Sequence, residues 1–126
     1  MKTAEEEAKV SHTVKMKLKI KDKNLFKAVA QRLGLEVKEN AEVRLYSSTH
    51  RGLAVKLPGW KYPIVVEEDG SLVYDNYNGN WGNFKELLRL EEEYVKELVA
   101  REARKKGLSV YTKRAKDGSL ILEVGR

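Results

Sequence analysis

The chain has 126 residues, the length of one ordinary domain, and 41% of them are hydrophobic, which is enough for one core. It contains no cysteine, which excludes disulfides, thiol nucleophiles and cysteine-bound zinc or iron–sulfur centres. Lys and Arg exceed Asp and Glu by 25 to 19, for a net charge of +6. This charge fits a polyanion partner, and equally the charge-rich composition of a thermophilic protein.

The hydropathy of the chain and its N-terminal residues predict its location in the cell. No apolar run approaches the roughly 18 residues of a membrane helix, and residues 1–10 lack the apolar core of a signal peptide. We therefore expect no membrane partner and a cytoplasmic location, in the host cytoplasm if the chain is viral. We expect residues 1–10 to form an N-terminal extension and residues 11–126 to form a single domain.

The clearest pattern is the strict alternation of apolar residues and lysines over residues 14–21. Period two places the apolar set on one face of a strand and the lysines on the other. The four lysines are Lys15, Lys17, Lys19 and Lys21. Asp22 then caps a predicted helix over residues 23–33, and Gly34 ends it.

Shorter elements follow this helix. The pattern predicts two short strands over residues 35–46, on either side of Glu39-Asn40, and a strand over residues 53–57. Residues 64–76 are typical of a hairpin that turns at Asp69-Gly70.

The last third of the chain is expected to hold a long helix and a hairpin. Asn83 is the predicted cap of a helix that ends near Lys106, and the final hairpin turns at Asp117-Gly118. The order strand, helix, Gly-Leu, two strands then occurs twice, which a duplicated βαββ unit or the chance recurrence of Asp-Gly turns would explain. We expect an α+β fold, a mainly antiparallel sheet with two helices packed on one face.

Several short motifs, taken in order, resemble a known group of proteins. They include Ser11-His12, Ile20-Lys21-Asp22, the block Glu39-Asn40-Ala41-Glu42-Val43-Arg44, the segment from Asp75 to Gly82, and Asp117-Gly118-Ser119. Together they resemble a family of small hypothetical proteins of unknown function found in cyanobacteria, algal chloroplast genomes and archaea. The chain departs from that family at Thr13 and Leu45. The resemblance implies a protein partner, with an ATPase as one candidate, and the composition resembles a hyperthermophilic archaeon or an archaeal virus.

Two loops are rich in aromatic residues. Residues 73–83 combine asparagines and glycines, which turn sharply, with aromatic side chains, and residues 58–63 form a second such loop. We predict that aromatic residues of these loops are anchors of a protein contact: Trp60, Tyr74, Tyr77 and Trp81. The alternative is a structural turn whose aromatic side chains cover the start of the long helix.

Basic residues offer a second kind of site. The lysine face of residues 14–21, together with Arg51 and Lys61, would bind a nucleic acid and make that binding steeply salt-dependent. Lysines on an exposed strand also prevent edge pairing, which is the alternative explanation. A homodimer through an open sheet edge is a further alternative.

Catalytic chemistry has little support. His12 and His50 are the only histidines and lie in separate segments, so we predict no metal site and no cofactor. Ser47, Ser48 and Thr49 place hydroxyl groups beside His50, but catalytic triads are seldom assembled from sequence neighbours. We predict no catalytic residue. The leading hypothesis is a non-enzymatic binding or accessory protein that acts through protein contacts. The alternatives are a nucleic-acid-binding protein and a metal-dependent or hydrolytic enzyme centred on His50.

Overall fold

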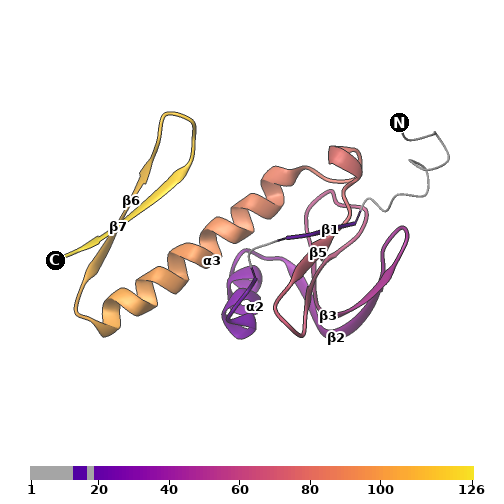
Figure 1. Cartoon of the computed structure of the whole chain (residues 1–126), viewed down its shortest axis with the longest axis horizontal. Coiled ribbons are helices and arrows are strands. Elements are labelled where there is room, and N and C mark those ends of the chain that lie inside the picture. Colours follow the sequence, from indigo (N-terminus) through magenta and orange to yellow (C-terminus); the bar gives the residue numbers. More distant parts are fainter. Residues whose placement is uncertain (1–12, 17–18) are drawn as a thin grey trace, which may run out of the picture.

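The computed structural model describes residues 13–16 and 19–126 (Figure 1). Its strands are β1 (Val14–Lys15), β2 (Glu36–Arg44), β3 (Thr49–Lys56), β4 (Ile64–Glu67), β5 (Leu72–Tyr74), β6 (Ser109–Arg114) and β7 (Leu120–Gly125). Its helices are α2 (Lys23–Arg32), the short 3₁₀ helix η1 (Tyr77–Gly79) and α3 (Phe84–Lys105).

Five strands form one sheet in the order β1-β5-β4-β3-β2, and every neighbouring pair is antiparallel. Strands β6 and β7 form a separate antiparallel hairpin. Figure 1 shows α3 running from the five-stranded sheet towards this hairpin. The predicted α+β class and the mainly antiparallel sheet are therefore confirmed.

Helices α2 and α3 cover one face of the five-stranded sheet. The rings of Phe26 in α2 and Tyr94 in α3 meet edge to face, with their centroids 5.4 Å apart. Both rings belong to a core that also contains apolar residues from β3, β4 and β5. The residues of α2 in this core are Leu25, Phe26, Val29 and Ala30. Their helical spacing buries one stripe of α2, which confirms the prediction of two helices on one face.

The opposite face of the sheet carries a second, smaller core. Ala54, Val65 and Val73 come from the three middle strands, and Val43 and Leu45 join them from β2 and the turn after it. Strand β4 is therefore buried on both faces, which explains its continuous apolar sequence Ile-Val-Val.

The predicted ends of the helices are confirmed. The Asp22 carboxylate accepts a hydrogen bond from the backbone N–H of Leu25 at 3.0 Å, and the Asn83 side chain accepts one from that of Lys85 at 2.9 Å. Gly34 follows α2 with a φ of +79°, a conformation that glycine adopts without strain.

Three predicted strand regions differ from the observed ones. The strand predicted over residues 53–57 begins four residues earlier, because β3 runs from Thr49 to Lys56. Residues 36–44 form one strand instead of two, because an irregular register between Lys38 and Ala41 accommodates Asn40, which has a positive φ. The strand expected over residues 14–21 is assigned only at β1, and Lys17 and Leu18 lie outside the described residues. Backbone hydrogen bonds from Met16 and Ile20 still follow the edge of β5 and the turn before it.

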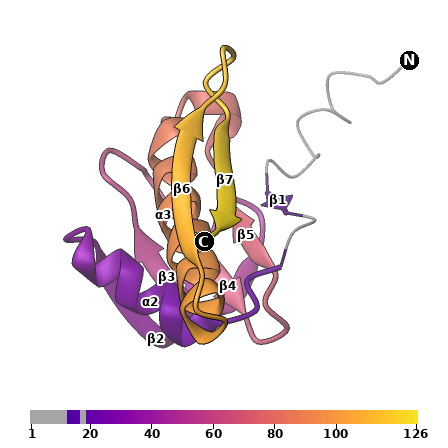
Figure 2. The same cartoon turned by 90° about the vertical axis from the view of Figure 1, so that its left-hand side faces the viewer.

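The final hairpin lies alongside α3 instead of joining the main sheet (Figure 2). The Arg114 guanidinium makes two hydrogen bonds to the Glu92 carboxylate, at 2.8 and 2.9 Å, and these tie β6 to α3. The element order β1-α2-β2-β3 recurs as β5-α3-β6-β7, but only the first hairpin joins the sheet. The duplicated βαββ unit therefore stays a prediction.

Candidate binding surface

The aromatic loop before α3 turns as its sequence predicts. Tyr77 and Asn78 both have positive φ angles, 46° and 51°. The Asp75 carboxylate accepts a hydrogen bond from the backbone N–H of Tyr77 at 3.1 Å, and the Asn76 amide donates one to the carbonyl of Gly82 at 3.2 Å. These bonds fold the loop back on itself, so that Trp81 lies beside Tyr77.

Two of the four predicted contact residues are core residues. Trp60 is only 4% exposed, and its indole N–H donates a hydrogen bond to the carbonyl of Asn83 at 3.0 Å. Its ring contacts that of Tyr74, which is also buried. Trp60 thus covers the start of α3, as the alternative of a structural turn predicts for an aromatic side chain of these loops. Because an interface anchor must be reachable by its partner, the predicted contact surface narrows to Tyr77 and Trp81.

Three tyrosines surround Trp81 on the surface. Its ring centroid lies 4.7 Å from that of Tyr77, 5.4 Å from that of Tyr46 and 5.7 Å from that of Tyr62. Tyr46 and Tyr77 are 51% and 39% exposed, and Trp81 and Tyr62 are half-buried. We call Tyr46, Tyr62, Tyr77 and Trp81 the aromatic patch. It is assembled from three loops that are far apart in sequence.

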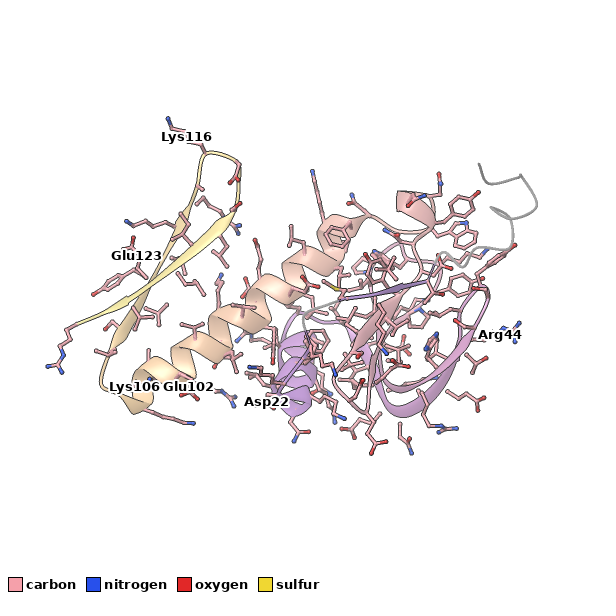
Figure 3. The ribbon with its side chains drawn as sticks, viewed as in Figure 1. Asp22, Arg44, Glu102, Lys106, Lys116 and Glu123 are labelled. Atoms are coloured by element: carbon pink, nitrogen blue, oxygen red, sulfur yellow. The ribbon has the colours of Figure 1, made fainter. Side chains whose placement is uncertain are left out.

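Cations border the aromatic patch. The Lys61 ammonium lies 4.4 Å from the centroid of the Trp81 ring, a cation–π contact. A groove of about 390 Å³ runs along β2 and β3 to Pro63, next to Tyr62 in the chain. Lys38, Arg44 and Lys56 line this groove together with two carboxylates, Glu36 and Glu42. None of the three cations forms a salt bridge with a described residue, whereas Glu42 pairs with Arg51. Figure 3 shows Arg44 at the end of the molecule away from the β6–β7 hairpin.

The lysine strand offers less free charge than its sequence indicates. Lys15 and Lys19 lie 3.5 and 3.6 Å from carboxylate oxygens of Glu67 and Asp69. A hydrogen bond from the backbone of Ser71, assisted by Lys19 and Lys15, lowers the pKa of Asp69 to about 2. Lys21 is exposed, and Lys17 lies outside the described residues. Arg51, another predicted nucleic-acid contact, pairs with Glu42 at 3.3 Å.

His50 connects the β2–β3 turn to β4. Its Nε2 lies 2.7 Å from the Ser48 hydroxyl, and its Nδ1 lies 3.0 Å from a Glu67 carboxylate oxygen. The order hydroxyl, imidazole, carboxylate is that of a catalytic triad. Alternation and strand pairing place His50 and Glu67 on one face of the sheet, a signal that neighbouring residues alone do not carry. Neither Ser48 nor His50 lines the cavities of about 470, 420 and 390 Å³ among the described residues.

We expect this network to stabilise the turn. Ser48→Ala and His50→Gln should each lower the free energy of unfolding by about 0.5–1.5 kcal/mol, the usual net value of one hydrogen bond. The double variant should lose less than the sum, because both substitutions remove the same bond. Urea denaturation of the four proteins measures this coupling. Hydrolysis of p-nitrophenyl acetate that Ser48→Ala abolishes would instead support the hydrolytic alternative.

Metal ligands and membrane spans were the remaining features to locate in residues 13–16 and 19–126. No group of three or more His, Asp or Glu side chains there is arranged to hold a metal ion. No helix in that part of the chain combines the length and apolarity needed to cross a bilayer. His12 lies outside it.

One residue that the sequence reading missed is Glu91. It follows Leu87 by four residues and precedes Val95 by four, so it lies on the apolar stripe of α3. Burial raises its pKa to about 7. A carboxylate inside an apolar helical stripe is the signal that would have found it.

The structure thus defines an α+β protein with an aromatic patch on its surface and, separately, a buried carboxyl group, that of Glu91, on α3. Comparisons with protein-family models, with curated proteins and with solved structures find no match. The resemblance to small hypothetical proteins of cyanobacteria, chloroplasts and archaea therefore stays a prediction.

Proposed function

We propose that this chain is a non-enzymatic binding protein that acts through a protein contact centred on the aromatic patch. The observation that supports it is the grouping of three tyrosines around Trp81 on the surface, two of them well exposed. Tyr and Trp are the residue types most enriched at the energetic centres of interfaces. The partner would present apolar groups to the patch.

The chemistry around the patch suggests a partner with acidic groups. Lys61 sits on the Trp81 ring, and Lys38, Arg44 and Lys56 line the adjacent groove without salt bridges to described residues. Carboxylates of a partner would pair with these cations at the rim of the contact, which favours fast and selective association.

A matched set of variants tests the proposal. Tyr46→Ser/Tyr77→Ser removes the exposed half of the patch, and Tyr111→Ser alters a tyrosine that is 53% exposed on β6. Both should leave the free energy of unfolding nearly unchanged, because surface substitutions usually change it by less than about 0.5 kcal/mol. We expect the wild type and Tyr111→Ser to capture one protein from an extract of the source organism. The double variant should bind that protein at least about 30-fold more weakly, a loss of about 2 kcal/mol.

Equal capture by the double variant would contradict the patch as the contact. Nucleic-acid binding remains the second hypothesis, and the Lys61 ammonium over the half-buried Trp81 ring of the aromatic patch is the observation that favours it. Fluorescence anisotropy with labelled single-stranded DNA, duplex DNA and RNA separates the two. Binding of one form that survives moderate salt and fails in the double variant would favour the nucleic-acid hypothesis.

The setting of this contact is also a proposal. We propose a cytoplasmic protein, in the host cytoplasm if the chain is viral, with an ATPase as one candidate partner. The lead to an ATPase comes from the family resemblance alone. A homodimer through a sheet edge would place two aromatic patches on one particle. Sedimentation velocity measures the oligomeric state directly.

A further inference from the structure

A cavity of about 470 Å³ lies between α3, the sheet edge formed by β5 and the segment after β1, and the β6–β7 turn. Seven of its thirteen described lining residues have aliphatic or thioether side chains: Met16, Ile20, Leu72, Leu88, Val95, Leu120 and Leu122. Its volume is within the range of small-molecule sites. This cavity shares no lining residue with the groove beside the aromatic patch. Figure 3 shows the hairpin residues Lys116 and Glu123 at the end of the molecule away from Arg44, which lines that groove.

The wall of this cavity contains a carboxylate without a partner. Glu91 Oε1 is buried and has no hydrogen-bond partner, and Glu91 forms no salt bridge with a described residue. Buried polar atoms in folded proteins are nearly always hydrogen-bonded, so such an atom needs an explanation. The Glu91 carboxylate also affects Tyr74. The pKa of the Tyr74 hydroxyl is raised by the burial of Tyr74 and, in addition, by the charge of Glu91.

The other polar groups in the wall are already occupied. The Glu92 carboxylate binds Arg114, and the Asp117 carboxylate accepts a hydrogen bond from the backbone N–H of Ser119 at 2.9 Å. The Tyr94 hydroxyl accepts one from the backbone N–H of Asp22 at 3.2 Å. The described lining residues include three carboxylates and no lysine, arginine or histidine. An anionic ligand would therefore be repelled.

We propose that this cavity binds a small organic cation with an apolar body, with its ammonium group on the Glu91 carboxylate. The ammonium supplies the charge-assisted hydrogen bond that Oε1 lacks. The apolar body covers Met16, Ile20 and the apolar side chains of β5, α3 and β7 that line the cavity. A neutral apolar ligand would leave the carboxylate buried and unpaired. This site is independent of the aromatic patch, and each proposal can fail without the other.

Binding to this site depends on pH in a defined direction. Burial raises the pKa of Glu91 to about 7, so the carboxyl group loses its charge as the pH falls through neutrality. Hydrogen bonds lower the pKa of Glu92 and of Asp117, so both stay ionised over that range. An alkyl ammonium, like lysine with a pKa near 10.4, also stays charged. The affinity should fall about tenfold between pH 8 and pH 6, because protonated Glu91 does not attract a cation.

Isothermal titration of the full chain with n-octylamine, n-octanoate and n-octanol tests the proposal. We expect n-octylamine to bind most tightly at pH 8. Glu91→Gln should weaken it at least tenfold and remove its pH dependence. Glu102→Gln is the control, since Glu102 is an exposed carboxylate on the same helix, paired with Lys105. Circular dichroism of both variants checks that they are folded, and methyl NMR shifts of Met16 and Ile20 locate the ligand.

Several results would overturn the proposal. One is no binding of n-octylamine at pH 8, and another is equal affinity for n-octanoate. A third is an affinity for n-octylamine that Glu91→Gln leaves unchanged. Self-association that rises with protein concentration and is lost in Glu91→Gln would show instead that a second copy of the chain fills the cavity.

Discussion

Trp60→Ala should lower the free energy of unfolding by about 3–5 kcal/mol, the usual loss when a buried Trp or Phe is truncated. The indole is buried under Gly82, contacts the Tyr74 ring and donates a hydrogen bond to the Asn83 carbonyl at 3.0 Å. The substitution therefore removes a core side chain and loosens the start of α3. Guanidinium denaturation measures the change against Tyr111→Ala, a truncation of an exposed ring that should cost less than about 0.5 kcal/mol.

A double-mutant cycle sharpens this test. A methyl group added at Gly82 would lie 2.4 Å from the Trp60 ring, so Gly82→Ala should cost about 1–3 kcal/mol on its own. In the Trp60→Ala background the ring is gone, and the added methyl group should cost much less. Equal costs in the two backgrounds would show that Gly82 and Trp60 are not in contact. A small loss for Trp60→Ala would contradict its place in the core.

Gly52→Ala is the second substitution with a large expected effect. Gly52 pairs with Glu67 where β3 crosses close to β4, and a Cβ atom there would lie 2.1 Å from the Val66 carbonyl oxygen. The obstacle is main chain, so no side-chain rotation relieves it. We expect a loss at the upper end of the roughly 1–3 kcal/mol typical of overpacking, or greater, with separation of the two strands.

Hydrogen exchange and denaturation together measure this effect. Amides of β3 and β4 should exchange faster in Gly52→Ala than in the wild type, since their hydrogen bonds open first. Gly125→Ala is the control, because a Cβ atom there meets nothing within 4 Å. An unchanged denaturation midpoint for Gly52→Ala would mean that β3 and β4 lie further apart than described.

The Trp60 substitution should also affect the aromatic patch. Trp60 and Trp81 belong to neighbouring loops that the backbone bond from Lys61 N–H to the Trp81 carbonyl, at 2.8 Å, holds together. One tryptophan fills the core and the other carries the patch. Buried Trp60 holds the loops that carry the aromatic patch, so Trp60→Ala should weaken partner binding and also lower the free energy of unfolding. Tyr46→Ser/Tyr77→Ser should weaken partner binding alone.

Local signals in the sequence determined most of the elements. Alternation marked β1, a short apolar run marked β4, and Asp22, Gly34 and Asn83 marked helix ends, because each acts on backbone groups within a few residues. The Asp-Gly pairs marked both later hairpins. The expected class, an antiparallel sheet with two helices on one face, follows from these elements, since two apolar helical stripes need one apolar sheet face to cover.

Only the tertiary structure decided which similar residues share a site. Nothing local distinguishes buried Trp60 from half-buried Trp81. Lys15 and Lys19 form salt bridges with Glu67 and Asp69, which lie about 50 residues away in the sequence. The β6–β7 hairpin has the same Asp-Gly turn signal as the β4–β5 hairpin, yet it does not join the main sheet. It packs against α3 and forms one wall of the cavity at Glu91. The physical reason is that backbone patterns act over a few residues, whereas burial, ion pairs and cavities depend on contacts between distant segments that form only when the chain is packed.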